Sequence, residues 1–282
     1  MAFSIFGRNI HETPGPGVSK DRPVKKPFFR FWEMFFERFW KMVRLSLLTF
    51  VFCLPVVTIG PALTGMTKVL HEYVLDKDTF IWNEFKKGFF TNLKMSVPVG
   101  LADVVFAVSF ICSLNVYPQL ADQTGSSFYY ALCVLAVGFA LTVFMMNFFI
   151  YPMIACTDLK LRQIIRNSFN LVALGLKTNI ITLLLVHLTA AILLILMLLS
   201  SSAVLILVPL ILISFLGFLI MFNSYPQIQK HVIEPYYEER GESNPEYDFL
   251  KPLSEDEAVF TDMGEQDLPE DMPHPKKGKT IS

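Results

Sequence analysis

The chain has 282 residues, of which 53% are hydrophobic and only 17% are charged, and its formal net charge is −1. Charged residues make up about a quarter of an ordinary soluble domain, so the composition excludes that class. Three long apolar stretches, around 96–117, 128–152 and 180–224, contain a single charged residue, Asp103. The sequence therefore predicts an all-α polytopic membrane protein.

The near-neutral total conceals an uneven distribution of charge. Residues 1–44 carry nine basic and four acidic side chains, and residues 45–229 carry nine and seven. Residues 230–282 carry six basic and fourteen acidic side chains. Because the basic residues lie beside the membrane segments and the tail is acidic, we expect no nucleic-acid partner.

Neither a metal site nor a disulfide framework is supported by the pattern of cysteines and histidines. The four cysteines lie in or beside apolar segments and include no CxxC pair: Cys53, Cys112, Cys133 and Cys156. Such cysteines behave as small hydrophobic residues. We therefore expect no metal and no cofactor.

The N-terminal region divides into two parts. Residues 1–27 contain four prolines and are expected to form a disordered arm. Residues 28–44 place charged side chains on one side of a helical projection and aromatic rings on the other. Such a helix is expected to lie in the headgroup plane, although a core helix or a continuation of the first span is the alternative. The residues assigned to this interfacial helix are Arg30, Trp32, Arg38, Trp40, Lys41 and Arg44.

The first apolar segment, 45–66, is interrupted by Pro55, Gly60 and Pro61. A full span here would place one of two Lys/Arg-rich regions outside, against the rule that basic connections stay in the cytoplasm. Segment 45–75 therefore either enters and returns as a broken hairpin or forms a fifth complete span. A hairpin would need its exposed backbone to be covered by the other helices.

Four further spans are predicted, over 95–117, 128–152, 178–200 and 203–224. The run over 178–224 exceeds the roughly 20 residues of one span, and three consecutive serines at 200–202 divide it. A short amphipathic helix is predicted over 158–170, between the second and third of these spans.

The distribution of lysine and arginine sets the expected orientation in the cell membrane. Nine lie in the N-terminal region, five in the 67–95 connection and four in the 153–178 connection, whereas the 118–127 loop and the serine turn have none. Both termini and the two basic connections are therefore expected to be cytoplasmic. Residues 230–282 are predicted to form a disordered acidic tail.

Four short motifs stand in a characteristic order along the chain: Gly60-Pro61-Ala62-Leu63-Thr64, Phe85-Lys86-Lys87-Gly88-Phe89-Phe90, Tyr151-Pro152 and Asp158-Leu159-Lys160-Leu161. Together with the aromatic and basic N-terminal helix, they resemble the YesL-like family of bacterial membrane proteins of unknown function, over about residues 28–225. Genes of that family often neighbour carbohydrate transporters and polysaccharide-degrading enzymes. The resemblance implies an accessory role in sugar uptake and supplies no catalytic residues.

One intramembrane polar layer is predicted from depth along the helices. Asp103 and His187 lie ten and nine residues into their segments, roughly 13–15 Å at the rise of an α-helix. Thr142 and Ser214 lie at a similar depth on the returning spans. The layer is either a proton or ligand site of a small secondary transporter or a set of hydrogen bonds that hold the helices together.

The 153–178 connection carries a candidate docking helix, with Lys160, Arg162 and Arg166 on one side and apolar residues on the other. It would contact a permease or ATPase subunit, or else lie on the lipid surface. The chain lacks GxxxxGK[ST], HExxH and GxSxG motifs, so we expect neither an ATPase nor another enzyme. The leading hypothesis is a non-enzymatic accessory or regulatory partner of a carbohydrate uptake system; the small transporter is the alternative.

Overall fold

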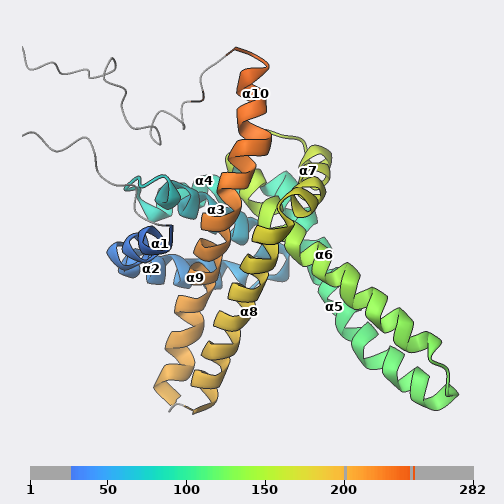
Figure 1. The fold of residues 1–282 in the computed structure, drawn as a ribbon. Coiled ribbons are helices and arrows are strands. Elements are labelled where there is room, and N and C mark those ends of the chain that lie inside the picture. The colour runs from blue at the N-terminus through green and yellow to red at the C-terminus, as the bar shows by residue number, and fades with distance from the viewer. Residues whose placement is uncertain (1–26, 200–201, 242–243, 245–282) are drawn as a thin grey trace, which may run out of the picture. The chain divides into compact units, whose positions relative to one another are not determined.

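The computed structural model describes residues 27–199, 202–241 and 244, and every regular element in this part of the chain is helical (Figure 1). The helices are α1 (Pro27–Glu37), α2 (Phe39–Cys53), α3 (Ile59–Val74), α4 (Ile81–Thr91), α5 (Leu93–Thr124), α6 (Phe128–Cys156), α7 (Leu161–Leu174), α8 (Leu176–Leu199), α9 (Ser202–Ile228) and α10 (Glu234–Glu238). The predicted N-terminal arm, most of the predicted tail and the serines at 200–201 lie outside the described residues.

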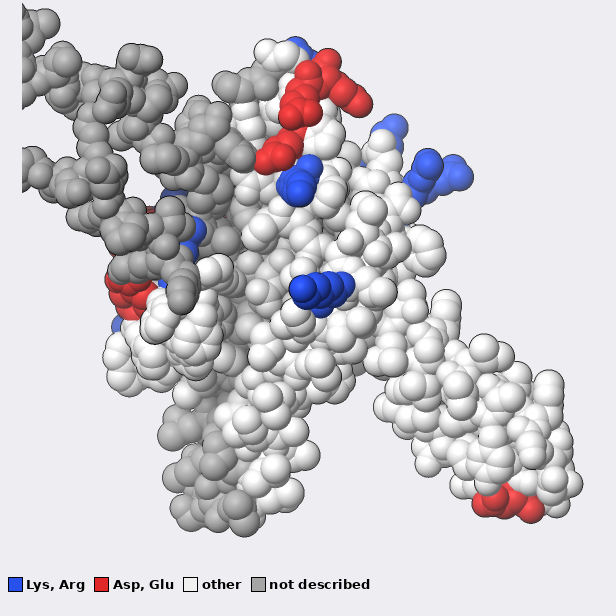
Figure 2. Space-filling view, in the orientation of Figure 1, with Lys and Arg blue, Asp and Glu red and all other residues white. Residues whose placement is uncertain are grey.

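Four segments of the described chain are long and apolar enough to cross a membrane: Leu93–Thr124, Phe128–Cys156, Leu176–Ile195 and Ile211–Glu238. The predicted all-α membrane fold is therefore confirmed. The helices α5 and α6 pack side by side as one hairpin, and α8 and α9 pack as another (Figure 1). On the face seen in Figure 2, the α5–α6 hairpin is uncharged except for acidic atoms at its end.

The interrupted first segment folds as two short helices that pack on one another. The helix α2 has 15 residues and α3 has 16, so each is only about 22–24 Å long. Neither length reaches the roughly 30 Å of the hydrocarbon core. Segment 45–75 therefore forms two short packed helices instead of one continuous helix, and the broken hairpin stays a prediction.

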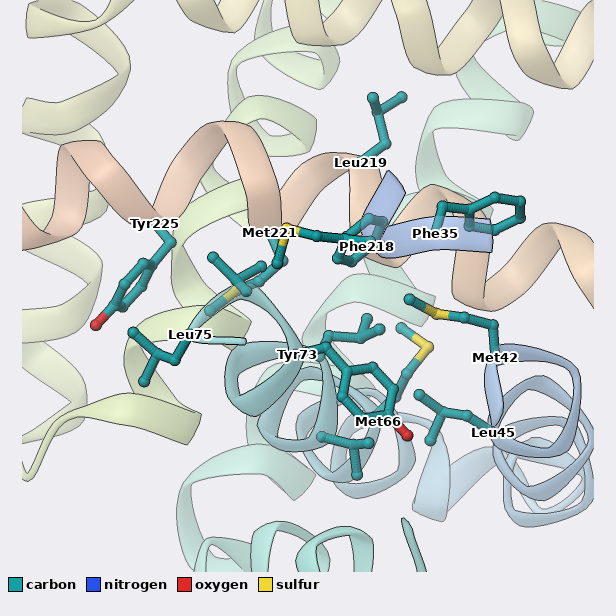
Figure 3. Close-up of a cluster of buried hydrophobic side chains, with 14 of the residues drawn as sticks. Phe35, Met42, Leu45, Met66, Tyr73, Leu75, Phe218, Leu219, Met221 and Tyr225 are labelled. Atoms are coloured by element: carbon teal, nitrogen blue, oxygen red, sulfur yellow. The ribbon is translucent and has the colours of Figure 1, made fainter. Parts of the chain in front are cut away.

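The core that organises this region is formed by α1, α2, α3, α4 and α9. Figure 3 shows ten of its buried side chains, namely Phe35, Met42, Leu45, Met66, Tyr73, Leu75, Phe218, Leu219, Met221 and Tyr225. A second buried cluster joins α5, α6, α7 and the end of α9. The helix α3 contacts α5, α6 and α9, so the broken hairpin lies between the two spanning hairpins.

Close backbone contact explains one of the glycine positions that interrupt the apolar pattern. A Cβ atom at Gly60 would lie 2.0 Å from the carbonyl oxygen of Ser96, and one at Gly100 would lie 2.5 Å from the Gly60 nitrogen. The helices α3 and α5 therefore cross at two glycines, and a side chain at either position would push them apart.

The C-terminal helix continues past the point at which the sequence predicts a disordered tail. A π-helix, Gln229–Ile233, follows α9 and leads into α10. Ile228 is fully buried, and Val232 and Ile233 pack against the two core clusters. These apolar contacts stabilise helix over residues 230–238, where the composition alone had suggested a tail.

Candidate functional site

Asp103, the charged residue of the three long apolar stretches, lies half-buried between α5 and α6. Asn147 Nδ2 donates a hydrogen bond of 2.9 Å to Asp103 Oδ1, and the Tyr151 hydroxyl donates one of 2.6 Å to Asp103 Oδ2. Asn147 and Tyr151 are four residues apart on α6, so both side chains leave the same face of that helix. Each carboxylate oxygen thus has one neutral donor.

Asn147 also leaves a polar atom without a partner. Its Oδ1 is buried and accepts no hydrogen bond from the described residues. Buried polar atoms are rarely left unsatisfied. The carboxylate of Asp103 and this amide oxygen together present acceptors to the α5–α6 interface.

The other members of the predicted polar layer make separate contacts. The Thr142 hydroxyl donates to the Gly138 carbonyl of its own helix at 3.0 Å. His187 is exposed, and its Nδ1 lies 2.8 Å from the Leu183 carbonyl oxygen. Its ring packs edge-on against Phe144 of α6, with centroids 5.6 Å apart.

Ser214, the fourth member of that layer, is buried where α9 meets α2. The Ser46 hydroxyl accepts a hydrogen bond of 2.9 Å from the Ser214 backbone nitrogen. Within the described residues, no hydrogen bond joins Asp103 to any of the other three. The partners of Asp103 are instead Asn147 and Tyr151. Counting residues along the helices did not identify these two side chains.

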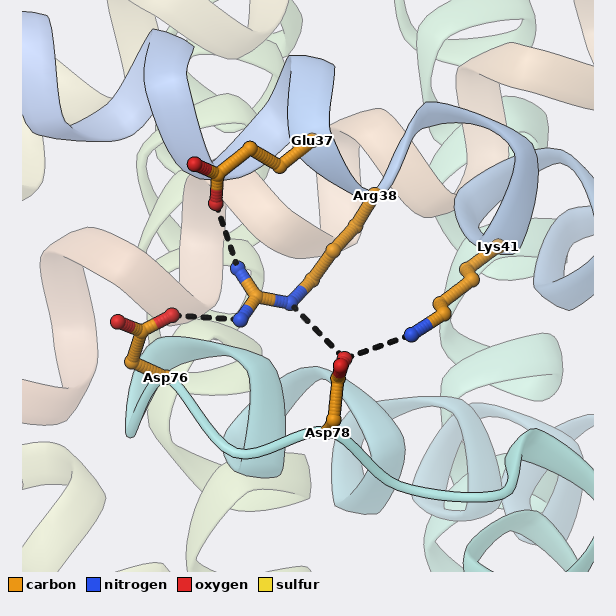
Figure 4. A network of polar contacts seen from close by, with 5 residues as sticks. All are labelled: Glu37, Arg38, Lys41, Asp76 and Asp78. Atoms are coloured by element: carbon orange, nitrogen blue, oxygen red, sulfur yellow. Dashed lines mark hydrogen bonds and ion pairs between the residues drawn. The ribbon is translucent and has the colours of Figure 1, made fainter. Parts of the chain in front are cut away.

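The helix expected over 28–44 is divided at Arg38, which separates α1 from α2. Figure 4 shows the Arg38 side chain pointing toward the loop after α3, between Asp76 and Asp78. Its guanidinium donates to Asp76 at 2.5 Å and lies 5.7 Å from the Tyr73 ring centroid. Lys41 donates to Asp78 at 2.6 Å.

This network changes the interpretation of the interfacial helix. Arg38 is buried and Lys41 is half-buried against the loop, whereas Arg30, Trp40 and Arg44 are exposed. The expectation that Arg38 faces the headgroup layer is therefore wrong, because its side chain is buried and acidic residues of the same chain surround its guanidinium. Sequence periodicity could not find these acids, which lie about forty positions away.

The aromatic face of α1 is partly buried against α9. Phe31 stacks on Phe218 at a centroid distance of 5.0 Å, and Phe35 meets Phe215 edge-on at 5.0 Å. Trp32 is half-buried beside them. Four other aromatic side chains of this region are more than half exposed: Phe28, Phe29, Phe36 and Trp40. The helix α1 thus contributes to the protein core and also presents rings outward.

The turn between α2 and α3 exposes apolar side chains while satisfying its backbone. Leu54, Val56 and Val57 are each more than half exposed. The Thr58 hydroxyl lies 2.7 Å from the Phe52 carbonyl oxygen and 2.8 Å from that of Pro55. Since freed carbonyl groups are costly in lipid, this hydroxyl suits a turn that enters the membrane.

The end of α3 carries a mixed-charge group outside the spanning helices. Glu72 forms ion pairs with Lys68 at 3.4 Å and Lys77 at 3.9 Å, and His71 Nδ1 lies 3.5 Å from its carboxylate. The contact with His71, followed by the two lysines, lowers the pKa of Glu72 to about 2. Burial raises the pKa of the neighbouring Tyr73 hydroxyl to about 12.

The amphipathic helix predicted over 158–170 is present as α7, Leu161–Leu174. Its inner face buries Ile164, Leu171 and Val172 in the second core cluster. Lys160, Arg162 and Arg166 are exposed. Three apolar side chains are exposed as well, namely Ile165, Phe169 and Leu174. The helix is therefore anchored on one side and open on the other.

Part of the chain matches the model of a known protein family. Residues 42–116 match the family model described as "Protein of unknown function, DUF624", which is the YesL-like family of membrane proteins. Over these residues the chain is similar to the DUF624 family, and its four long apolar helices are those of a multi-pass membrane protein. Comparisons with curated proteins and with solved structures found no match.

The DUF624 match covers the broken hairpin, α4 and most of α5. It therefore includes Thr58, the crossing glycines and Asp103, whereas the two donors on α6 lie outside it. Within the described part of the chain, no group of three His, Cys, Asp or Glu residues could hold a metal ion.

Proposed function

We propose that this protein is a non-enzymatic accessory or regulatory subunit of a bacterial carbohydrate uptake system, in which it binds a permease or ATPase subunit. The observation that carries the proposal is α7, a helix fixed to the protein by one face and open on the other. The open face combines the cations Arg162 and Arg166 with the exposed rings and side chains of Phe169 and Ile165. Exposed apolar side chains beside cations suit contact with another protein.

The link to carbohydrate rests on the resemblance to the YesL-like family, and its non-enzymatic character rests on the lack of catalytic motifs in the sequence. The lightly buried spans agree with an assembly role. In the most apolar 18-residue stretch, only 11% of the residues of α5 and 22% of those of α6 are buried within the chain. Their surfaces are therefore open to lipid or to the helices of a partner.

Purification of the tagged protein from its own host in mild detergent tests this function. Wild type should retain subunits of a sugar transporter, identified by mass spectrometry. The variant R162E/R166E should lose them because the charges of the α7 face are reversed. The variant K177E/K230E reverses two exposed lysines elsewhere and should retain them. A wild-type preparation without transport subunits, or equal retention by both variants, would overturn the proposal.

The second candidate function is a small secondary transporter built around Asp103. The observation that favours it is the pairing of Asp103 with neutral donors alone, beside the unsatisfied Asn147 Oδ1. Ionisable groups inside a membrane mark proton or ion pathways in many transporters. Substrate-dependent proton flux in proteoliposomes, abolished in Asp103→Asn and retained in His187→Gln, would support this function. Flux that is absent from wild type would dismiss it.

A further inference from the structure

The outer face of α4 combines two lysines with polar and aromatic side chains. The opposite face packs on α3, where Phe85, Gly88 and Phe89 are buried. Five outer residues line an open hollow of about 400 Å³, namely Asn83, Lys86, Lys87, Phe90 and Thr91. Their spacing of three and four positions places them on one side of the helix, so the hollow belongs to a single helical face.

The two lysines of this face have no intramolecular partner among the described residues. Lys86 and Lys87 are exposed, and no acidic side chain in the described ranges forms an ion pair with either. Glu84, the acid of the same helix, is half-buried and forms no ion pair with them. By contrast, Lys41 and Lys68 are paired with acids of the chain. The α4 face thus presents uncompensated positive charge.

The position of α4 in the chain places this face where the protein enters the membrane. The helix ends at Thr91, and the spanning helix α5 begins at Leu93. The exposed Lys94 follows at once. A cation that starts a spanning helix marks the headgroup layer. The lysines of the last two turns of α4 therefore lie within about 10 Å of that layer.

A second contact connects α4 with the apolar turn of the broken hairpin. The Trp82 ring is half exposed and lies 6.3 Å from the Phe52 ring at the end of α2. The turn that follows exposes Leu54, Val56 and Val57. Tryptophan favours the boundary between acyl chains and headgroups, so the α4 face continues an apolar surface on one side and carries cations on the other.

We propose that the outer face of α4 is a binding site for the phosphate of an anionic phospholipid. Lys86 and Lys87 donate charged hydrogen bonds to the phosphate oxygens. Asn83 and Thr91 supply neutral donors at the edges of the hollow, and Phe90 and Trp82 lie against the glycerol and upper acyl chains. Lysine ammonium groups are common phosphate ligands, and clustered cations beside a span favour anionic lipid. The site is separate from the docking face of α7 and does not depend on the proposed transport partner.

Fluorescence of Trp82 provides a direct test, because the chain has only three tryptophans, Trp32, Trp40 and Trp82. In a W32F/W40F background, Trp82 is the single reporter and lies on the proposed site. The protein is placed in nanodiscs of equal parts phosphatidylglycerol and phosphatidylcholine, with brominated acyl chains on one lipid or on the other. Random contact gives equal quenching in the two preparations. The proposal predicts stronger quenching by brominated phosphatidylglycerol.

Two variants that remove the same amount of positive charge distinguish a specific lipid site on α4 from a general attraction between the protein and anionic lipid. In K86Q/K87Q the preference for phosphatidylglycerol should fall on the order of tenfold or more, because each cation near the surface contributes separately. K160Q/R162Q removes the same charge at the start of α7 and should keep the preference. Equal quenching by the two lipids, or a preference that survives K86Q/K87Q, would overturn the lipid site.

A competition arm distinguishes a lipid headgroup from free phosphate. Inorganic phosphate at low millimolar concentration should leave the quenching unchanged relative to chloride of equal ionic strength; selective loss of quenching would assign the site to a soluble phosphate ligand instead. Native mass spectrometry of the wild type and K86Q/K87Q, both with all three tryptophans, gives an independent readout. Wild type should retain more phosphatidylglycerol adducts, and equal adducts would again contradict the proposal.

Discussion

The guanidinium of Arg38 donates a hydrogen bond of 2.5 Å to the carboxylate of Asp76, thirty-eight positions later in the chain. The pair joins the break between α1 and α2 to the loop after α3 (Figure 4). The Arg38 side chain is 8% exposed, whereas that of Asp76 is 66% exposed. The buried cation is therefore compensated by this loop and by Glu37 of α1, whose carboxylate lies 3.7 Å from the guanidinium.

Replacement of Arg38 by Met should lower the free energy of unfolding by about 1–2 kcal/mol, since the Asp76 hydrogen bond and the contact over Tyr73 are lost. Lys41→Met removes a cation from the same network but from an exposed pair, and it should change stability little. Thermal unfolding in detergent measures both. Equal shifts in melting temperature for the two variants would mean that the burial of Arg38 adds nothing to stability.

The hydroxyl of Thr58 stabilises the turn of the broken hairpin. Thr58→Val keeps the shape of the side chain but leaves the Phe52 and Pro55 carbonyl groups without this donor. The expected loss of stability is about 1–2 kcal/mol, because no water replaces the bond within lipid. Thr124→Val is the control, since its exposed hydroxyl bonds to Leu120 at the end of α5. If Thr124→Val lowers the stability as much as Thr58→Val, the Thr58 hydroxyl does not stabilise the turn more than an exposed hydroxyl stabilises a helix end.

The crossing of α3 and α5 predicts a sharp difference between two glycines. Gly60→Ala should prevent α3 from packing on α5 and so disrupt folding, because the new Cβ would lie 2.0 Å from the Ser96 carbonyl oxygen. Gly138→Ala in α6 should be neutral or slightly stabilising, because nothing lies within 4 Å of its Cβ position. Yield and monodispersity after size-exclusion chromatography report the difference. A well-behaved Gly60→Ala variant would contradict the close crossing.

The sequence predicted the spanning helices well because long apolar runs leave few alternatives in a membrane. The second of the four predicted spans shows this: α6 covers Phe128–Cys156, and the sequence predicted 128–152. The proline and glycine breaks likewise indicated the interruption between α2 and α3. Here the local chemistry of the backbone determined the structure.

The partners of Asp103 and Arg38 could not be predicted in the same way. Depth along a helix follows from counting residues, but the rotation of one helix about its axis relative to another depends on packing. Asp103 therefore meets Asn147 and Tyr151, while Thr142, predicted at the same depth, bonds within its own helix. The helix is divided at Arg38, whose side chain pairs with acids about forty positions away, and periodicity contains no information about them.

The carboxylate of Glu72 predicts a dependence of stability on pH. Its pKa falls from an ordinary value of 4.5 to about 2 in the folded protein. The folded state therefore binds fewer protons than the unfolded state between these values, so this contribution is full above pH 4.5 and is lost as the pH falls toward 2. His71, Lys68 and Lys77 are the groups that favour the charged form.

The variant Glu72→Gln should be less stable than wild type at pH 6, and the difference in melting temperature should shrink between pH 4.5 and pH 3. Glu84→Gln serves as the control, because the described residues form no ion pair with that carboxylate, and its difference from wild type should stay small throughout. A gap between wild type and Glu72→Gln that stays constant with pH would show that Glu72 stabilises the fold without its charge.

The broken hairpin predicts the same side of the membrane for two distant positions. A chain that enters at α2 and returns through α3 places the N-terminal region and the loop around residue 80 together, whereas a complete fifth span would separate them. An epitope tag before Met1 and a second at Phe80, which is 82% exposed, can be compared by protease access in sealed vesicles. We expect both tags to be cytoplasmic, in agreement with the lysines and arginines that flank segment 45–66. Opposite accessibility would mean that α2 and α3 together cross the bilayer.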